Sequence, residues 1–444
     1  MLEKHNIYSI PVGDYFGCPK DACLLIYAPL KNKFFLSTPA ERDNLEEQLA
    51  ENRPSEFLKE LTSPVETNSP EVSVDTFCTL HLLLNEKCNF HCQYCYSAAG
   101  RSTAELTMET IRPVLDYFLS SGRKAVSERT VMFMGGGEPV LSWSLLEEAT
   151  DYAEQVAKEQ GVNVHFSLTT NGSLMTDRML DFLQEHHFTV QISFEILPDV
   201  QMKQRGSYDL VAENLIRLTD RGINNYVRST ITVENVDRIP EMVEYCHAHF
   251  PKVKKMSCQQ VVDPDFFSST QIVEDFFDRY FRSYQKGQQL AAQYGIELRS
   301  SSSHLVNYSK RERFCFNLLC LTPYGTLTLC PDVSSPVEPD YEKSVIGQVE
   351  GPGVTFNTTA FDRLACGNIH TIGKCQTCYA RWNCGSGCPS SRRVYREEIF
   401  DSICDFYRKM LCNSLMEALA EKYAADTGRD LIRDITRKLS ETKV

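Results

Sequence analysis

The sequence predicts an α/β protein, in which a parallel sheet follows a small α+β module and precedes a cysteine-rich region. Strand–helix alternation repeats six times between residues 76 and 300. A short strand pair and two helical patterns occupy residues 1–75, and ten of the 18 cysteines lie between Cys315 and Cys412. Because 444 residues exceed one compact core of ordinary size, we expect two or three domains.

The first 75 residues are predicted to form a separate module. Two apolar runs, over 23–30 and 33–38, predict a hairpin, and helical patterns over 39–50 and 54–62 follow it. The next stretch is rich in Ser, Thr and Pro, which is typical of a linker. We therefore place a domain boundary near residue 75.

Residues 76–300 predict a sheet of parallel strands. The candidate strands are rich in apolar and β-branched residues, as expected when both faces are buried; they cover 78–84, 130–134, 164–169, 190–196, 227–233 and 254–261. Thr107 and Ser142 are expected N-caps of the intervening helices, and Gly122, Gly161 and Gly222 are expected to end helices. Six consecutive strand–helix units imply a parallel sheet, which is either open and doubly wound or a partial barrel.

The regular alternation ends after residue 300. Residues 301–412 are rich in cysteine and loops, with a short strand at 326–329, so metal-cluster ligation is expected to substitute for a large core. Residues 413–444 are assigned to a C-terminal tail, within one or two amphipathic helices that begin near residue 405.

Composition excludes several classes of partner. A net charge of −13 and a pI near 5.4 argue against nucleic acid, which needs Lys and Arg to displace counterions. We find no apolar run of the roughly 18 residues typical of a membrane helix, and the N-terminus lacks the apolar core of a signal peptide. A cytoplasmic protein without a membrane partner is expected, and in that reducing compartment 18 cysteines indicate metal ligands before disulfides.

One cysteine group indicates a catalytic metal site. Cys88, Cys92 and Cys95 are spaced C-x3-C-x2-C and follow the first strand of the sheet by a few residues. The ends of parallel strands are where barrels and open α/β sheets place their chemistry. Three thiolates on a four-iron cluster leave one iron without a protein ligand, and an open position marks a catalytic site. A zinc site, or a cluster with a remote fourth cysteine, is the alternative.

This loop, with Tyr94 before its last cysteine, resembles the signature of the radical S-adenosylmethionine (SAM) superfamily. The resemblance implies a [4Fe-4S] cluster whose open iron chelates SAM. It also implies reductive cleavage of SAM to a 5′-deoxyadenosyl radical that abstracts hydrogen from the substrate. The fold it implies is a partial (β/α)6 barrel of TIM-barrel type.

The resemblance extends to the ends of later strands. MGGGEP matches the element that holds the SAM ammonium, here with Gly136, Gly137 and Glu138. A carboxylate and carbonyls suit an ammonium, which only donates hydrogen bonds. Asn171 ends the third strand, and Ser193 ends the fourth as an expected SAM contact.

Two positions depart from the family pattern. Members of the family usually carry Ser-x-Asp-Gly after the fourth strand, where this sequence has Glu195 and Ile196. Glu195 is therefore an expected SAM contact whose ribose interaction is altered. Arg205 lies where a family arginine pairs with the SAM carboxylate, a partner that suits its guanidinium.

The later cysteines resemble the complete SPASM domain of radical SAM maturases of peptides and proteins. The motifs are C-x9-G-x4-C, then C-x2-C-x5-C-x3-C, then one more cysteine. By resemblance to anaerobic sulfatase-maturating enzymes, the first auxiliary [4Fe-4S] cluster takes Cys315, Cys320, Cys330 and Cys388, and the second takes Cys375, Cys378, Cys384 and Cys404. Without Cys320 as a ligand, the first auxiliary cluster would keep an open iron. Cys412 is an alternative to Cys404.

The resemblance also suggests a substrate class and partners. The N-terminal module resembles a reduced leader-recognition element, so a precursor peptide is an expected partner, with a packing extension as the alternative. Ferredoxin or flavodoxin is the expected electron donor. Asp332, two residues after Cys330, lies near the catalytic aspartate of sulfatase maturases.

Three functions remain open from the sequence. The first is a peptide maturase that forms a thioether or carbon–carbon cross-link. The second is a sulfatase-type maturase that makes formylglycine from Cys or Ser. The third is a non-enzymatic iron–sulfur electron carrier or zinc scaffold.

Overall fold

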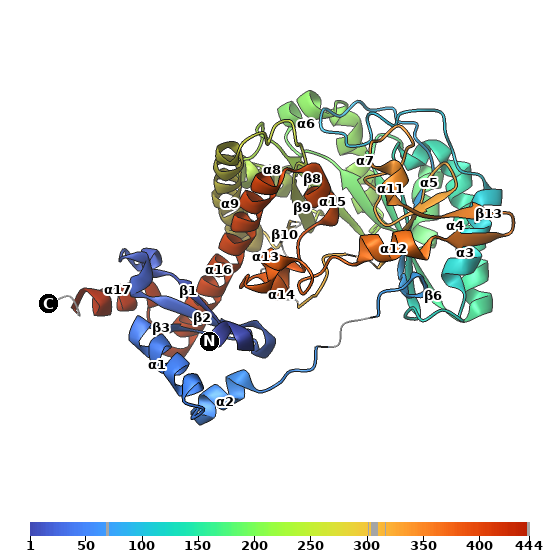
Figure 1. Ribbon diagram of the computed structural model, residues 1–444. Helices are drawn as coiled ribbons and strands as arrows, with labels where there is room; N and C mark the ends of the chain where they lie inside the picture. The colour runs from blue at the N-terminus through green and yellow to red at the C-terminus, as the bar shows by residue number, and fades with distance from the viewer. Residues whose placement is uncertain (68–70, 301, 303–309, 316, 442–444) are drawn as a thin grey trace.

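The computed structural model describes residues 1–67, 71–300, 302, 310–315 and 317–441. At its centre lies a parallel sheet in which neighbouring strands follow chain order (Figure 1). The six predicted strands are present as β4 (Thr79–Leu83), β5 (Glu128–Met134), β6 (Asn163–Thr170), β7 (Thr189–Ser193), β8 (Asn225–Ile231) and β9 (Lys255–Gln260). This order does not reverse as it would in a doubly wound sheet, so the predicted α/β fold takes its partial-barrel form.

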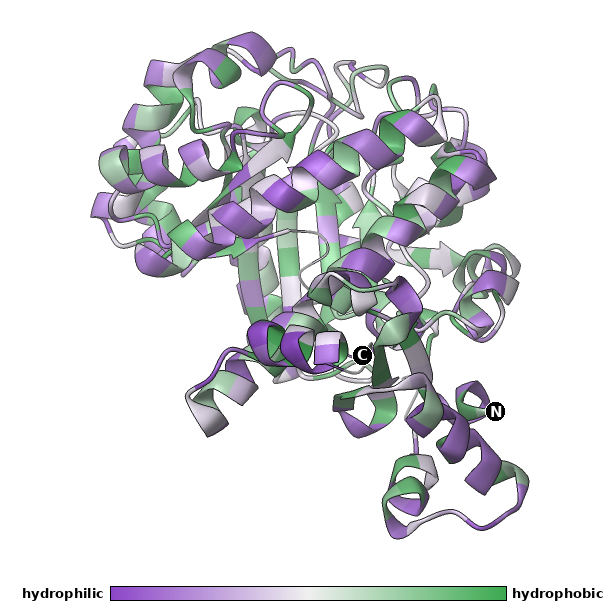
Figure 2. Cartoon of the chain, turned by 90° about the vertical axis from the view of Figure 1, so that its left-hand side faces the viewer, coloured by the Kyte–Doolittle hydropathy of each residue, from purple (hydrophilic) through white to green (hydrophobic). Residues whose placement is uncertain are grey.

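Helices cover the outer face of this sheet. They are α3 (Met108–Leu119), α4 (Trp143–Gln160), α5 (Asp177–Glu185), α6 (Pro198–Gln204), α7 (Tyr208–Asp220), α8 (Ile239–His249) and α9 (Thr270–Gln293). They carry both hydrophilic and hydrophobic residues, as expected of helices with one buried face (Figure 2). Helix α9 was not predicted; it leads to β10 (Glu297–Arg299), which pairs in parallel with β9.

The helix-end signals are confirmed only in part. Gly161 closes α4 in the left-handed conformation, with φ of 66°, as predicted. Thr107 and Ser142 occupy the N-cap positions of α3 and α4, but neither side chain caps its helix. Ser142 instead accepts a hydrogen bond from Asn85 Nδ2 at 2.6 Å, so its hydroxyl links two loops at the carboxyl end of the sheet.

Strand β5 shows how the sequence distributes side chains between the two faces of the sheet. Arg129, Val131 and Phe133 are 1%, 0% and 0% exposed, whereas Met132 and Met134 line a cavity on the other side. Side chains of a strand alternate between faces, so the apolar residues at every second position pack the helices. The side chains at the intervening positions face the cavity and can contribute to a binding site.

The sheet continues into the cysteine-rich region. Strand β11 (Leu318–Leu321) pairs in parallel with β4, and β12 (Thr326–Thr328), β13 (Val345–Glu350) and β14 (Gly353–Phe356) extend the sheet with antiparallel pairing. The helices of this region are α11 (Tyr341–Ser344), α12 (Thr358–Ala365), α13 (Gly373–Gln376), α14 (Arg381–Cys384), α15 (Pro389–Val394), α16 (Glu397–Thr427) and α17 (Leu431–Glu441). The predicted boundary after residue 412 therefore falls inside one continuous helix.

The N-terminal module packs against this C-terminal region. It contains the predicted hairpin with an added strand, as β1 (Tyr8–Pro11), β2 (Leu24–Ala28) and β3 (Lys33–Ser37), followed by α1 (Pro39–Ala50) and α2 (Glu56–Thr62). Trp382 Nε1 donates to Asn6 Oδ1 at 2.8 Å, and the Tyr27 hydroxyl donates to Asn383 Oδ1 at 2.8 Å. The module lies beside α16 and α17 (Figure 1). Within the described ranges, none of the helices is both long and apolar enough to cross a membrane.

Candidate functional site

A cavity of about 800 Å³ opens at the carboxyl ends of the parallel strands. The predicted site residues that line it come from the loops after β4, β5, β6 and β7, and from the cysteine-rich region: Cys88, Cys92, Tyr94, Cys95, Gly136, Gly137, Glu138, Asn171, Ser193, Arg205 and Asp332. Parallel strands bring these loops together because their carboxyl ends meet at one edge of the sheet. The structure thus gathers all the predicted SAM-site residues except Glu195 around one space.

The loop after β4 presents three thiols to this cavity. Cys88, Cys92 and Cys95 are all partly exposed and unpaired. The backbone N–H of Phe90 donates to Cys88 Sγ at 3.5 Å, and Arg101 Nη2 donates to Cys95 Sγ at 3.4 Å. Donors aimed at sulfur stabilise the thiolate form, which is the form that binds iron. The donor set therefore fits an iron–sulfur cluster.

Thiolates are the protein ligands of iron–sulfur clusters, and three of them leave one iron of a four-iron cluster without a protein ligand. Burial raises the pKa of Cys92, and a bound cation would offset that penalty.

The glycine-rich loop packs directly on the cysteine loop. A Cβ at Gly136 would lie 2.0 Å from the Glu86 carboxylate, and one at Gly137 would lie 2.0 Å from the Lys87 carbonyl oxygen. At Gly137 the neighbouring atom belongs to the backbone, so only glycine permits this approach. The backbone N–H of Gly137 donates to the Asn85 carbonyl at 2.9 Å. The two loops therefore form one rigid wall of the cavity.

Glu138 joins this wall to the next strand. Its side chain accepts hydrogen bonds from the Thr170 hydroxyl at 2.6 Å and from the Asn171 backbone N–H at 2.7 Å. The residue is 3% exposed, and burial raises the pKa of its carboxyl group. Because these bonds occupy both oxygens, Glu138 holds the ends of β5 and β6 together while it lines the cavity.

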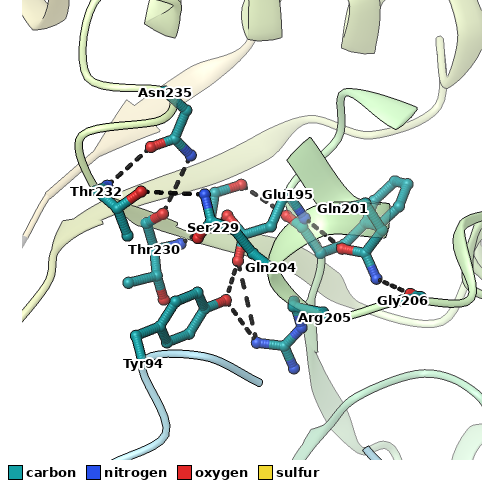
Figure 3. A network of polar contacts seen from close by, with 11 residues as sticks. Tyr94, Glu195, Gln201, Gln204, Arg205, Gly206, Ser229, Thr230, Thr232 and Asn235 are labelled. Atoms are coloured by element: carbon teal, nitrogen blue, oxygen red, sulfur yellow. Dashed lines mark hydrogen bonds and ion pairs between the residues drawn. The ribbon is translucent and has the colours of Figure 1, made fainter. Parts of the chain in front are cut away.

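Tyr94 and Arg205, which line the cavity, form a polar network with the fully buried Glu195 behind them (Figure 3). The Tyr94 hydroxyl donates to the Glu195 carboxylate and accepts from Arg205 Nη1 at 2.9 Å. The other Glu195 oxygen accepts from the Thr230 backbone N–H at 3.0 Å. Burial raises the pKa of Glu195 to about 7, although Arg205 and these donors oppose the rise. The carboxylate predicted to contact SAM thus faces Tyr94 instead of the cavity.

Ile196 adopts a backbone conformation that favours glycine, the residue that the family resemblance leads us to expect here. It is 0% exposed and adopts φ of 66°, a left-handed conformation that is strained for a β-branched residue. Gln201 supports this turn, since its Oε1 accepts from the Glu195 backbone N–H at 3.0 Å. The turn after β7 therefore holds a buried isoleucine where the backbone favours glycine.

The eight later cysteines fall into the two predicted groups. Burial raises the pKa of Cys315 to about 12, and the nearby Cys388 thiol raises it further. Burial also raises the pKa of Cys330. The nearby Asp332 carboxylate and the Cys320 and Cys388 thiols raise it further. Cys315, Cys320, Cys330 and Cys388 are thus close to one another, and their role as ligands of one cluster remains a prediction.

The second group gathers around Cys384. Burial raises the pKa of Cys384, and the thiols of Cys404, Cys378 and Cys375 raise it further in that order. Cys412 instead lies beside Tyr15 of the N-terminal module. The structure therefore places Cys404, and not its alternative Cys412, with the other three thiols.

Several cavity residues were missed by the sequence analysis. His81 of β4 and Arg228 of β8 line the cavity from the strands, and Arg101 follows the cysteine loop. Burial lowers the pKa of His81 to about 4, which keeps its imidazole neutral. His81 and Arg228 are polar residues inside apolar strand patterns, and that alternation was the signal available for them.

Comparison with known proteins identifies the domain that carries this cavity. Residues 82–246 match the family model of the Radical SAM superfamily. The uncharacterized protein MJ0907 of Methanocaldococcus jannaschii is 22% identical over 58% of this chain and 86% of its own length. A cysteine-type anaerobic sulfatase-maturating enzyme of Clostridium novyi is 21% identical over 73% of this chain and 92% of its own length.

Two solved structures share the fold. The structure of anSMEcpe with bound AdoMet aligns with a TM-score of 0.57 and 14% identity, covering 77% of this chain and 98% of that one. Streptococcus suis SuiB bound to its precursor peptide SuiA aligns with a TM-score of 0.50 and 11% identity, covering 86% and 95%. At these identities the likeness concerns the fold alone.

Proposed function

We propose, on the premise that this chain belongs to the radical SAM superfamily, that it is a maturase of a ribosomally made peptide. The observation that carries the proposal is the shared cavity, which three thiols line from the barrel and Asp332 from the cysteine-rich region. Radical SAM enzymes use SAM and a [4Fe-4S] cluster for radical chemistry. The product we propose is a thioether or carbon–carbon cross-link in the peptide.

The loops at the carboxyl ends of the barrel strands would supply the ligands of the first cluster and the SAM contacts. Cys88, Cys92 and Cys95 would hold a cluster with one open iron, which would supply the reducing chemistry for SAM cleavage. Glu138 and Asn171 fix the loops that would receive the SAM ammonium. Arg205, oriented by Tyr94, would pair with the SAM carboxylate.

Two further clusters would occupy the later cysteine groups. Four thiolates in each group close every iron position, and closed clusters transfer electrons. We propose that they accept the electron left after hydrogen abstraction, or relay electrons from a ferredoxin or flavodoxin. A guanidinium group lies beside the second of these cysteine groups, since Arg408 Nη1 is 4.0 Å from Cys378 Sγ.

The test begins with SAM cleavage. Anaerobically reconstituted and reduced enzyme should convert SAM to 5′-deoxyadenosine, and the Cys88→Ala/Cys92→Ala/Cys95→Ala variant should not. Equal yields would remove the radical SAM assignment of this loop and favour an electron carrier. The wild-type enzyme should then be co-expressed with short open reading frames that neighbour its gene, and the peptides analysed by mass spectrometry. A cross-link appears as loss of two hydrogen atoms.

A sulfatase-type maturase is the second candidate. The fold shared with anSMEcpe and the position of Asp332 in the cavity favour it. Here the peptide would gain formylglycine in place of Cys or Ser. From Cys the mass change differs from that of a cross-link, whereas from Ser it is the same loss of two hydrogen atoms, so the aldehyde is then identified by its reaction with a hydrazine reagent. Asp332→Asn should abolish that reaction, and unchanged turnover would remove Asp332 as its base.

The N-terminal module is the proposed dock for the peptide leader. Strands β1 and β3 are the edges of its sheet, and the exposed ring of Phe57 on α2 lies 5.4 Å from that of Phe35 on β3. Deleting the module would also remove Asn6 and Tyr27, which bind the C-terminal region, so a truncation would test two effects at once. Phe57→Asp should weaken capture of a modified precursor peptide without loss of iron. Unchanged capture would favour a packing extension.

A further inference from the structure

An arginine just after the cysteine loop reaches back across it. Arg101 lines the cavity and follows Cys95 by six residues. Its Nη1 atom donates to the Phe90 carbonyl oxygen at 3.0 Å, and its Nη2 atom donates to Cys95 Sγ at 3.4 Å. Phe90 stands between Cys88 and Cys92 in the sequence, so one guanidinium joins the middle of the loop to its last thiol.

The guanidinium of Arg101 is held in this position by its surroundings. The residue is only partly exposed, and its Nε atom is shielded from solvent. Phe90, which supplies the carbonyl acceptor, is 5% exposed. A guanidinium is a planar fork, so a bond from one nitrogen fixes the direction of the other. The donation to sulfur is therefore a built feature of the loop, unlike a chance contact of a mobile surface arginine.

The three thiols of the loop differ in the donors that they receive. Cys88 Sγ accepts from the backbone N–H of Phe90 at 3.5 Å, whereas Cys95 Sγ accepts from Arg101. Within the described ranges, no hydrogen bond to Cys92 Sγ is observed. A hydrogen bond from a charged donor is roughly twice as strong as one between neutral groups. Arg101 is thus the strong donor of this set, and a substitution can remove it.

A second arginine in the chain allows a direct comparison. Arg408 Nη1 lies 4.0 Å from Cys378 Sγ in the second auxiliary group, and the same guanidinium forms an ion pair with Asp405. For Arg101 no ion pair is observed among the described residues. A carboxylate partner offsets the field of a guanidinium at a nearby sulfur, so Arg101 should act on its thiol more strongly than Arg408 does.

We propose that Arg101 is a positioning residue that raises the reduction potential of the cluster at the cysteine loop. The inference rests on the proposed function, which places a [4Fe-4S] cluster on the three thiols of this loop. Reduction adds one negative charge to a cluster. A positive N–H donor at a ligand sulfur therefore stabilises the reduced form more than the oxidised form, and hydrogen bonds to sulfur are among the factors that set cluster potentials.

The test is an anaerobic redox titration of the complete holoenzyme. The protein is reduced stepwise with dithionite in the presence of redox mediators, and the reduced clusters are followed by electron paramagnetic resonance. The signal whose shape changes when SAM is added is assigned to the cluster of the cysteine loop. Its midpoint potential is then measured without SAM. Iron content is determined for every protein in parallel.

Arg101→Gln removes the charge and should weaken the electron affinity of that cluster by about tenfold, which is a fall of about 59 mV for a one-electron couple. Arg101→Lys keeps the charge without the planar fork and should lower the potential by less. This variant also serves if the glutamine variant loses its cluster. Arg408→Gln is the matched control, because Arg408 donates to a thiol of another group and should leave this potential unchanged.

Three results would overturn the inference. An unchanged potential in Arg101→Gln with full iron content would show that the guanidinium does not act on the cluster. An equal fall in Arg408→Gln would show a general effect of charge. Loss of iron from both Arg101 variants would show that the arginine assembles the site and does not set its potential.

Failure of the proposed function gives a different result. In that case no signal of the reduced wild-type protein responds to SAM, whatever the behaviour of the Arg101 variants.

Discussion

The hydroxyl of Tyr94 accepts a hydrogen bond from Arg205 Nη1 at 2.9 Å. Tyr94 belongs to the cysteine loop after β4, and Arg205 follows α6, the helix after β7. The contact therefore ties the proposed cluster loop to the opposite side of the cavity. It also means that the proposed cofactor contacts and the fold depend on the same side chains.

Tyr94→Phe should destabilise the protein measurably. The change removes one hydroxyl and leaves the side chains of Glu195 and Arg205, 0% and 10% exposed, without a shared partner. An unsatisfied buried polar group costs about 1–3 kcal/mol, so the free energy of unfolding should fall by that amount. Tyr152→Phe is the matched control, because its hydroxyl donates to Asp116 at an exposed position. Denaturant titrations that give equal losses would contradict the role assigned to Tyr94.

Glu195 should make stability depend on pH. Its folded-state pKa is raised by burial from 4.5 to about 7, so the folded state binds more protons than the unfolded state between these values. Stability from this group is therefore greatest at low pH and is lost as pH rises towards 7. Glu195→Gln cannot ionise and should lack this decline. Thermal unfolding of both proteins from pH 5.5 to 8 checks the prediction, and parallel curves would refute it.

At position 196, glycine should be better tolerated than alanine. Ile196 is buried with φ of 66°, and this conformation costs an L-residue roughly 1–2 kcal/mol. Both substitutions lose the buried side chain, but only the change to glycine would also relieve the strain. Alanine is usually less destabilising than glycine in an ordered segment, and this order should reverse here. Ile196→Gly should be more stable than Ile196→Ala by about 1 kcal/mol. At Ile192, which is buried in β7, the alanine variant should instead be more stable than the glycine variant.

The two candidates for the last auxiliary ligand should behave differently. Cys404 lies with Cys375, Cys378 and Cys384, whereas Cys412 lies beside Tyr15. Cys404→Ala should lower the iron content of anaerobically purified protein by up to about one third, the share of one cluster in three. Cys412→Ala should leave iron unchanged, and iron loss in that variant alone would reverse the assignment.

The sequence predicted the parts of the fold that local patterns encode. Apolar, β-branched runs marked all six parallel strands, and fixed cysteine spacings marked the groups that the structure brings together. The pairing of β11 with β4 was not predictable in this way, because Cys78 and Asn317, which flank that contact, are 239 residues apart. Strand β1 was missed because Tyr8–Pro11 offers only four residues, too short a stretch for an alternating pattern.

The orientation of individual side chains was also beyond the sequence. A carboxylate after the fourth strand was expected to face SAM, yet Glu195 turns back to Tyr94. Its side chain is one methylene longer than the aspartate usual at this position, which lets the carboxylate reach the hydroxyl. Arg228 could have been identified as a cavity residue from the sequence. It is a charged residue in an otherwise apolar strand, and side-chain alternation fixes the face on which it lies.

The register between β11 and β4 has a consequence for electron flow. Cys320 stands opposite His81 in that pairing, and β4 runs on into the loop of Cys88. One proposed auxiliary centre is therefore anchored on a strand adjacent to the one that leads to the proposed catalytic centre. Neighbouring strands keep a spacing of about 4.8 Å. Clusters held by Cys320 and Cys88 would accordingly be kept at a fixed separation by the hydrogen bonds between these strands, and electron transfer between them would not depend on motion of the two regions while the strands stay paired.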